Sequence, residues 1–180
     1  MVAIDKQLKD LTVLINEKQV EQGVLEIAEK INAAFPEDET LHLICVLKGS
    51  VMFFVDLVKH LKMPTQLEFI RLSSYGDDDK SSGRVKSIDM NLPILEGKNI
   101  LIVEDIVDTG YTAQFLTNIL KAEQRPKTLK FAAFLNKECA RKVDFEPDFY
   151  SYVVDDKFLV GYGLDYKGYY RNLPYVGYFG

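Results

Sequence analysis

The sequence has few of the residues that build several common kinds of site. It contains only two cysteines, Cys45 and Cys139, and two histidines, His42 and His60. The cysteines lie far apart, without the paired spacing of a metal site or a disulfide framework, so we expect a reducing, cytoplasmic location. Because histidines are so few, acid–base chemistry near neutral pH falls mainly to carboxylates, lysines or tyrosines.

Two further absences limit the expected partners. The formal net charge is −5, so no overall basic field attracts nucleic acid or an anionic membrane. The N-terminal residues show no signal-peptide hydrophobic region, and no apolar run is long enough to cross a bilayer. We therefore expect no nucleic-acid or membrane partner. With 180 residues, 47% of them hydrophobic, we expect one domain over residues 1–180 with a substantial core.

The apolar pattern predicts alternating strands and helices. Helices are expected at 17–35, at 51–61 with Ser50 as N-cap, and at about 111–121, and strands at 41–47, 65–73, 84–92, 100–103, 128–135 and 149–154. Residues 74–83 are polar and predict a loop, and the tail from 155 to 180 predicts no regular helix. This α/β order favours an open, mostly parallel sheet, whose ligands bind beyond the carboxyl ends of the strands.

The stretch from Ile100 to Thr112 is the most informative part of the chain. Four apolar residues are followed by Glu104 and Asp105, then by Asp108, and then by Thr109, Gly110, Tyr111 and Thr112. This pattern predicts a buried strand, a charged turn and the start of a helix, whose unpartnered N–H groups bind phosphate well. Carboxylates beside a phosphate would repel it unless a cation or sugar hydroxyls stand between them. The stretch therefore predicts a phosphorylated sugar with a divalent metal.

This run resembles the phosphoribosyl diphosphate motif of the type I phosphoribosyltransferases, in the form found in their hypoxanthine and hypoxanthine-guanine branch. Residues 156–166 and 169–174 resemble the tail of the same branch. The resemblance implies a central, mostly parallel sheet flanked by helices, with a small hood from the terminal segments and a flexible lid loop. It also implies a magnesium-dependent purine salvage enzyme that forms homodimers or homotetramers. Such an enzyme transfers 5-phosphoribosyl from phosphoribosyl diphosphate to hypoxanthine and guanine, giving a nucleoside monophosphate (IMP or GMP) and pyrophosphate.

The resemblance also implies which residues hold the phosphosugar. Glu104 and Asp105 face the ribose hydroxyls and one magnesium ion, and Asp165 holds a second ion during turnover. Ser74 and Tyr75 open the lid, which excludes water from the reacting sugar. The full set of expected phosphoribosyl diphosphate contacts is Lys48, Gly49, Ser74, Tyr75, Glu104, Asp105, Thr109, Gly110, Tyr111, Thr112 and Arg171. In the family, the peptide bond before the residue matching Lys48 is often cis.

The purine side follows from the same resemblance. Asp108 would be the general base at the purine nitrogen, although a carboxylate here could instead cap the helix. Phe158 would stack on the purine and Lys157 would donate to its 6-oxo group, which predicts discrimination against adenine. The remaining expected purine neighbours are Lys137 near the 6-oxo group and the sugar, the Leu159 carbonyl near C2, and Asp165.

Two other classes of function were weighed against this one. A regulator built on the same fold would bind phosphoribosyl diphosphate and read nucleic acid, but the sequence has neither an extra DNA-binding domain nor a basic stripe. A phospho-receiver would carry its acidic pair after the first strand, whereas here the acids lie mid-chain and a phosphate loop follows at once.

Overall fold

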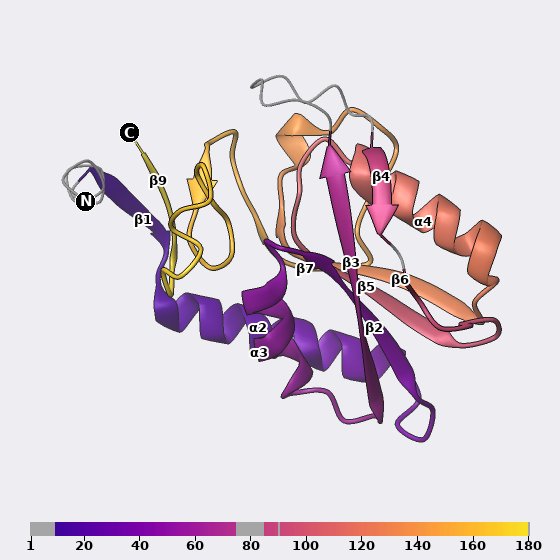
Figure 1. Cartoon of the computed structure of the whole chain (residues 1–180). Helices are drawn as coiled ribbons and strands as arrows, with labels where there is room; N and C mark the ends of the chain where they lie inside the picture. The colour runs from indigo at the N-terminus through magenta and orange to yellow at the C-terminus, as the bar shows by residue number, and fades with distance from the viewer. Residues whose placement is uncertain (1–9, 75–84, 90, 180) are drawn as a thin grey trace.

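The computed structural model describes residues 10–74, 85–89 and 91–179 (Figure 1). Its helices and strands are, in chain order, β1 Leu11–Ile15, α2 Glu17–Ala34, β2 Leu41–Leu47, α3 Val51–Val58, β3 Thr65–Ser74, β4 Val85–Asp89, β5 Asn99–Val107, α4 Tyr111–Gln124, β6 Thr128–Asn136, the 3-10 turn η1 Glu138–Ala140, β7 Phe149–Val153, β8 Leu159–Val160 and β9 Val176–Phe179. Among the described residues, no helix has both the length and the apolarity that a membrane crossing requires.

The main sheet has six strands in the order β4-β3-β2-β5-β6-β7. All neighbours are parallel except β3 and β4, which run antiparallel. This confirms the mostly parallel sheet and the strand that returns from the loop after β3. A second, antiparallel sheet of order β1-β9-β8 joins the two ends of the chain and confirms the expected hood (Figure 1). The lid segment lies outside the described residues from position 75 to 84.

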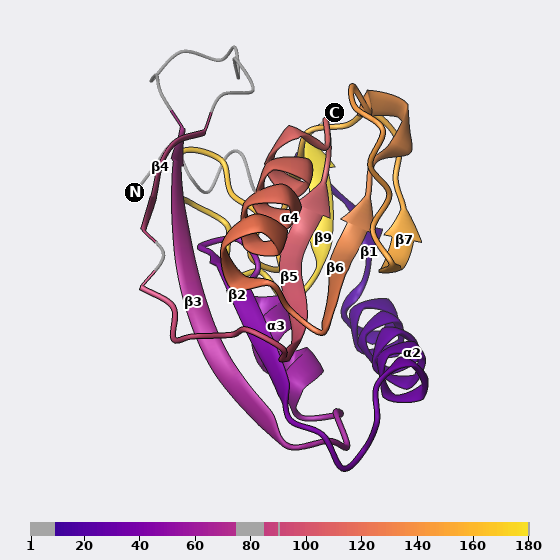
Figure 2. The ribbon, with the colours of Figure 1, turned by 90° about the vertical axis from the view of Figure 1, so that its right-hand side faces the viewer.

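Helices cover both faces of the main sheet, as Figures 1 and 2 show. Because successive side chains of a strand point to opposite faces, β5 contributes side chains to two hydrophobic cores, one on each face of the sheet. Leu101 and Val103 pack in the core beneath α2 and α3, whereas Ile100 and Ile102 pack in the core beneath α4. Each face of the central strands is therefore buried, which fixes the register that brings the strand ends together.

Local signals explain where α2 begins and ends. Asn16 Oδ1 accepts from Gln19 N at 3.0 Å, and Gln19 Oε1 accepts from Asn16 N at 2.9 Å, which forms a capping box. The helix ends one residue before Phe35, as Pro36 requires. Ser50 occupies the N-cap position of α3, as predicted, but its Oγ donates to the Val46 carbonyl at 2.7 Å and makes no capping hydrogen bond to the helix.

The short strands β1, β8 and β9 near the ends of the chain were not predicted, and β5 is longer than expected. β1 and β9 are short and pair with each other across the whole length of the chain. β5 continues through the acidic residues to Val107, because Glu104 still pairs with Ala133 and Ile106 with Leu135 on β6. The acids therefore lie on an extended strand instead of a turn.

Candidate active site

The predicted phosphate loop lies between β5 and α4. Gly110 occupies the N-cap position of α4 with φ 85°, and no side chain among the described residues caps this helix. The first N–H groups of α4 are thus available to an anion. The capping role considered for Asp108 is wrong, because Asp108 lies two residues before the cap and its side chain is exposed.

The turn after β6 supports this loop from behind. Arg141 Nη1 donates to the Asp108 carbonyl at 2.6 Å, and Lys142 N donates to the Thr109 carbonyl at 2.9 Å. A Cβ added at Gly110 would lie 2.9 Å from Arg141 Cδ, so glycine is needed for both space and conformation. Arg141 also contacts the Asn136 side chain. Sequence reasoning missed Arg141, because an isolated arginine in a polar turn carries no pattern.

Glu104 and Asp105 are adjacent carboxyls whose pKa values are both raised. Burial, and then the charge of Asp105, raise the pKa of Glu104 well above its ordinary value. Burial also raises the pKa of Asp105, although hydrogen bonds, including one from Ile106 N at 2.8 Å, and the charge of Arg171 oppose that rise. A bound cation would favour ionisation of both carboxyls.

A hard divalent cation suits this acidic pair. No group of three or more histidine, cysteine, aspartate and glutamate side chains that could hold a metal occurs in the described part of the chain. Magnesium commonly binds through one or two carboxylates and keeps several waters or substrate oxygens. Glu104 and Asp105 fit such an ion, with the remaining oxygens coming from solvent and ligand.

The Lys48 turn meets the acids, as the parallel strands β2 and β5 predict. The peptide bond between Leu47 and Lys48 is cis, in agreement with the family expectation. A Cβ added at Gly49 would overlap Asp105 Oδ2, and a Cβ added at Gly163 would overlap the Gly49 carbonyl. The turn is therefore packed between the acidic strand and the tail, with glycine at both contacts.

The tail brings a cation to the same place. Arg171 Nη1 donates to the Gly163 carbonyl at 2.6 Å, and Arg171 Nη2 pairs with Asp165 Oδ1 at 2.5 Å. The other oxygen of Asp165 accepts from Gly168 N at 2.6 Å. Asp165 thus fixes both the Arg171 guanidinium and the turn from Asp165 to Gly168.

A cavity of about 210 Å³ opens between the phosphate loop and the tail. Lys137, only 9% exposed, donates from Nζ to the Lys157 carbonyl at 3.0 Å and pairs with Asp156 Oδ1 at 2.9 Å. The Lys157 ammonium instead lies 3.9 Å from the centre of the Tyr178 ring. The lining residues are Asp105, Ile106, Asp108, Lys137, Lys157, Phe158, Leu159, Leu164 and Asp165.

Phe158 offers an aromatic face at this cavity. Its side chain is 59% exposed, and its ring makes an edge-to-face contact with Tyr166 at 5.7 Å. Leu159 beside it is buried in β8 and is tied to β9 by the hood sheet. The cavity therefore combines a flat apolar surface, a buried lysine and carboxylates, a combination suited to a heteroaromatic base.

Residues 12–167 match the family model described as the phosphoribosyl transferase domain. Over 169 residues the chain is 43% identical to the hypoxanthine-guanine phosphoribosyltransferase of Aquifex aeolicus. This alignment covers 93% of this chain and 94% of that protein. The chain belongs to the hypoxanthine-guanine phosphoribosyltransferase family.

Other relatives in this phosphoribosyltransferase family agree in sequence and structure. The hypoxanthine-guanine phosphoribosyltransferase of Bacillus subtilis is 40% identical over 165 residues, covering 92% of this chain and 91% of that protein. The crystal structure of a hypoxanthine phosphoribosyltransferase from Staphylococcus aureus superposes with a TM-score of 0.86 at 34% identity, covering 96% of this chain and 93% of that one.

Most of the residues predicted for a phosphoribosyltransferase site meet at the carboxyl end of the main sheet. Lys48, Gly49, the stretch 104–112, Lys137 and the tail residues come from separate elements that converge there. Ser74 is the last residue of β3, and Tyr75 lies outside the described residues. Besides Arg141, sequence reasoning missed Tyr162 and Asp56, which join the tail to α3 through a hydrogen bond of 2.9 Å.

Proposed function

We propose that this protein transfers 5-phosphoribosyl from phosphoribosyl diphosphate to a 6-oxopurine, hypoxanthine or guanine, and releases pyrophosphate. The observation that carries this proposal is the single cavity lined by Asp108, Lys137, Phe158 and the carboxylates Asp105 and Asp165. A base acceptor, a lysine donor and an aromatic surface stand beside the acids expected at the sugar. A purine nitrogen and the sugar carbon that it attacks would therefore meet in one place.

On the sugar side, we assign the 5′-phosphate to the loop from Thr109 to Thr112 at the start of α4. The pyrophosphate would lie against the Lys48–Gly49 turn and Arg171, which adjoin Asp105. Glu104 and Asp105 would hold the ribose hydroxyls and magnesium. The ion, when bound, offsets the charge of the departing pyrophosphate.

On the purine side, we assign proton acceptance to Asp108. The purine nitrogen bonds to the sugar carbon as the bond from that carbon to pyrophosphate breaks, and the N–H proton passes to the carboxylate. Phe158 stacks on the purine, and the Leu159 carbonyl lies near C2. We assign the donor to the 6-oxo group to Lys137, which is 9% exposed at this cavity and uses two of its three ammonium N–H groups on the Lys157 carbonyl and Asp156, so that one is left for the purine. The Lys157 ammonium lies over the Tyr178 ring.

Several finer predictions stay predictions. Asp165 Oδ1 pairs with Arg171 and Oδ2 accepts from Gly168, so we assign Asp165 to positioning Arg171, and a second magnesium ion there stays a prediction. The homodimer or homotetramer, the cytoplasmic location and the single domain over residues 1–180 also stay predictions.

The test is nucleotide formation by the purified protein. With hypoxanthine, phosphoribosyl diphosphate and magnesium, we expect a spectrophotometric change from base to nucleoside monophosphate, and we expect a chelator to abolish it. Absence of nucleotide with every 6-oxopurine would contradict the proposal. Tight binding of phosphoribosyl diphosphate without turnover would instead support the regulator class.

A further inference from the structure

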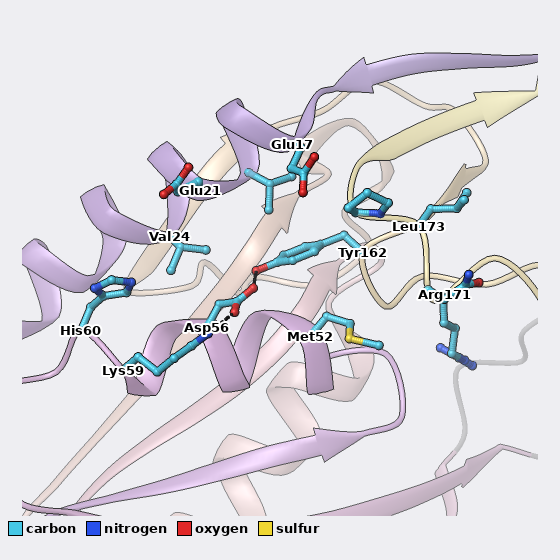
Figure 3. A pocket seen from close by; sticks show the side chains of 13 residues that line it. Glu17, Glu21, Val24, Met52, Asp56, Lys59, His60, Tyr162, Arg171 and Leu173 are labelled. Carbon is cyan, nitrogen blue, oxygen red and sulfur yellow. Dashed lines mark hydrogen bonds and ion pairs between the residues drawn. The ribbon is translucent and has the colours of Figure 1, made fainter.

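A tyrosine of the tail reaches across to the helix that follows the Lys48–Gly49 turn. Tyr162 Oη donates to Asp56 Oδ2 on α3 at 2.9 Å, as Figure 3 shows. The two side chains lie in the wall of a cavity of about 530 Å³ between α2, α3 and the tail. Arg171, on the tail, lines the same cavity, and in Figure 3 its side chain points away from the Tyr162–Asp56 hydrogen bond.

Tyr162 is held in place by its surroundings. Its φ is 48°, in the left-handed region that residues other than glycine rarely adopt, and its neighbours Gly161 and Gly163 also have positive φ angles, of 95° and 99°. The side chain is 6% exposed, and its ring packs 4.9 Å from that of Phe134. Its N–H donates to the Leu173 carbonyl at 2.8 Å. Burial, and then the charge of Asp56, raise the pKa of Tyr162, so its hydroxyl stays a donor.

The hydrogen bond between Tyr162 and Asp56 is one of two contacts that join the tail to the elements of the expected pyrophosphate site. Asp56 lies on α3, whose first turn leaves the Lys48–Gly49 turn directly. Gly163, the residue after Tyr162, packs against the Gly49 carbonyl and accepts from Arg171 Nη1 at 2.6 Å. The tail and the turn are thus joined at two points, one at the site and one at its base.

We propose that Tyr162 and Asp56 are a positioning pair that fixes the distance between the Lys48–Gly49 turn and Arg171, and thereby sets the affinity for the pyrophosphate end of the substrate. Neither side chain lines the cavity assigned to the purine. The inference rests on the proposed function, because it assigns the pyrophosphate to these groups.

The test is Tyr162→Phe, which removes the hydroxyl and keeps the ring. We expect the KM for phosphoribosyl diphosphate and the Ki of pyrophosphate to rise roughly three- to tenfold, the usual net worth of one intramolecular hydrogen bond. The KM for hypoxanthine should stay within about twofold of wild type. If the role of Tyr162 were purely structural, the variant would have a lower Tm, and the KM values for phosphoribosyl diphosphate and hypoxanthine would change by the same factor.

Tyr152→Phe is the matched control. Tyr152 Oη donates to the Gln19 carbonyl at 2.6 Å, and its ring contacts that of Phe134 at 5.7 Å, but it is not in contact with the turn or the tail arginine. It should therefore leave both KM values unchanged.

Asp56 supplies a second, independent set of variants. Asp56→Ala should reproduce the effect of Tyr162→Phe. Asp56→Asn should keep most of the wild-type affinity, because its amide oxygen still accepts the hydrogen bond. The double variant Tyr162→Phe with Asp56→Ala should bind phosphoribosyl diphosphate no more weakly than either single variant. Because Asp56 also pairs with Lys59 at 2.7 Å, Lys59→Met controls for that exposed ion pair.

Two outcomes would overturn the inference while the proposed function stands. One is an active wild type whose Tyr162→Phe and Asp56→Ala variants keep the wild-type KM for phosphoribosyl diphosphate. The other is an equal rise in both KM values. A wild type that forms no nucleotide would instead contradict the proposed function.

Discussion

The two regions that form the site are stabilised in different ways. The stretch from β5 to α4 is regular, and its backbone is held by the sheet and the helix on either side of Gly110. The tail has only the two-residue strand β8 before β9, and it contains positive φ angles at Gly161, Tyr162 and Gly163, among others. Backbone hydrogen bonds within its own turns, together with contacts to residues far away in the chain, hold it in place.

The difference concerns how each half of the site is maintained. The phosphate loop lies between two regular elements, and Arg141 and Lys142 from the turn after β6 donate to its carbonyls. The tail has backbone hydrogen bonds within its own turns, and contacts such as Tyr162 with Asp56 and Gly163 with Gly49 join it to α3 and the Lys48–Gly49 turn. We therefore expect side-chain changes in the first region to alter chemistry with little effect on folding, and small changes in the tail to affect both.

The largest expected effect is on the chemistry of the first region. Asp108→Asn should lower kcat by roughly 10²- to 10⁴-fold, because the amide cannot accept the purine proton. Nucleotide binding should change little, since Arg141 holds the backbone carbonyl of residue 108 and not its carboxylate. Steady-state kinetics with nucleotide titration measures both. Asp38→Asn, an exposed acid before β2, is the control, and turnover equal to wild type in Asp108→Asn would refute the base assignment.

A glycine of the tail should show the opposite pattern. Gly163→Ala places a methyl group on the Gly49 carbonyl at a φ of 99°, so we expect unfolding to become easier by roughly 2–4 kcal/mol and kcat/KM to fall at least about tenfold. Gly97→Ala, at φ 68° with no neighbour within 4 Å, should cost only about 1 kcal/mol. Chemical denaturation compares them, and equal losses of stability would show that Gly163 is not at a tight junction.

The aromatic surface of the tail should contribute mainly to base binding. Phe158→Ala should raise the KM for hypoxanthine roughly tenfold through lost stacking, and leave the KM for phosphoribosyl diphosphate within about twofold. Phe115→Ala, on the exposed side of α4, serves as the control. A rise confined to phosphoribosyl diphosphate would place the purine elsewhere.

The smallest expected effect concerns the acidic pair and pH. The pKa of Glu104 is raised in the folded protein, so the folded state binds its proton more tightly than the unfolded state does. Without metal, stability should therefore fall as pH rises above the ordinary glutamate range, and magnesium should restore it.

Glu104→Gln should weaken this dependence and leave only the part that comes from Asp105. Thermal unfolding from about pH 5 to about pH 8 should show the variant gaining on metal-free wild type as pH rises, since glutamine does not titrate. The apparent affinity of wild type for magnesium should weaken as pH falls, because protons compete for the carboxylates. Parallel Tm curves for the two proteins would contradict a raised Glu104 pKa.

Sequence patterns predicted the fold and one half of the site more fully than the other. Period and turn signals placed β2, β5, α4 and their convergence, because burial on both faces of a parallel strand leaves a continuous apolar run. They missed β1, β8 and β9, whose pairing in the second sheet has no local signal, and the extension of β5 through Glu104, which follows from its pairing with β6.

The tail shows why the rest could not be predicted. Its residues were placed in the site by family resemblance alone, since a tyrosine- and glycine-rich segment has no periodicity to interpret. The position of the Lys157 ammonium, over the Tyr178 ring, depends on a partner on β9. Tertiary contacts of this kind are not written in local sequence.

Substrate discrimination tests the central claim most directly. We predict that kcat/KM of wild type for hypoxanthine exceeds that for adenine by about 10³-fold or more, and that Lys137→Met lowers the hypoxanthine value by at least about a hundredfold, with Lys157→Met changing it less. Equal use of adenine by wild type, or an unchanged hypoxanthine value in Lys137→Met, would contradict the account.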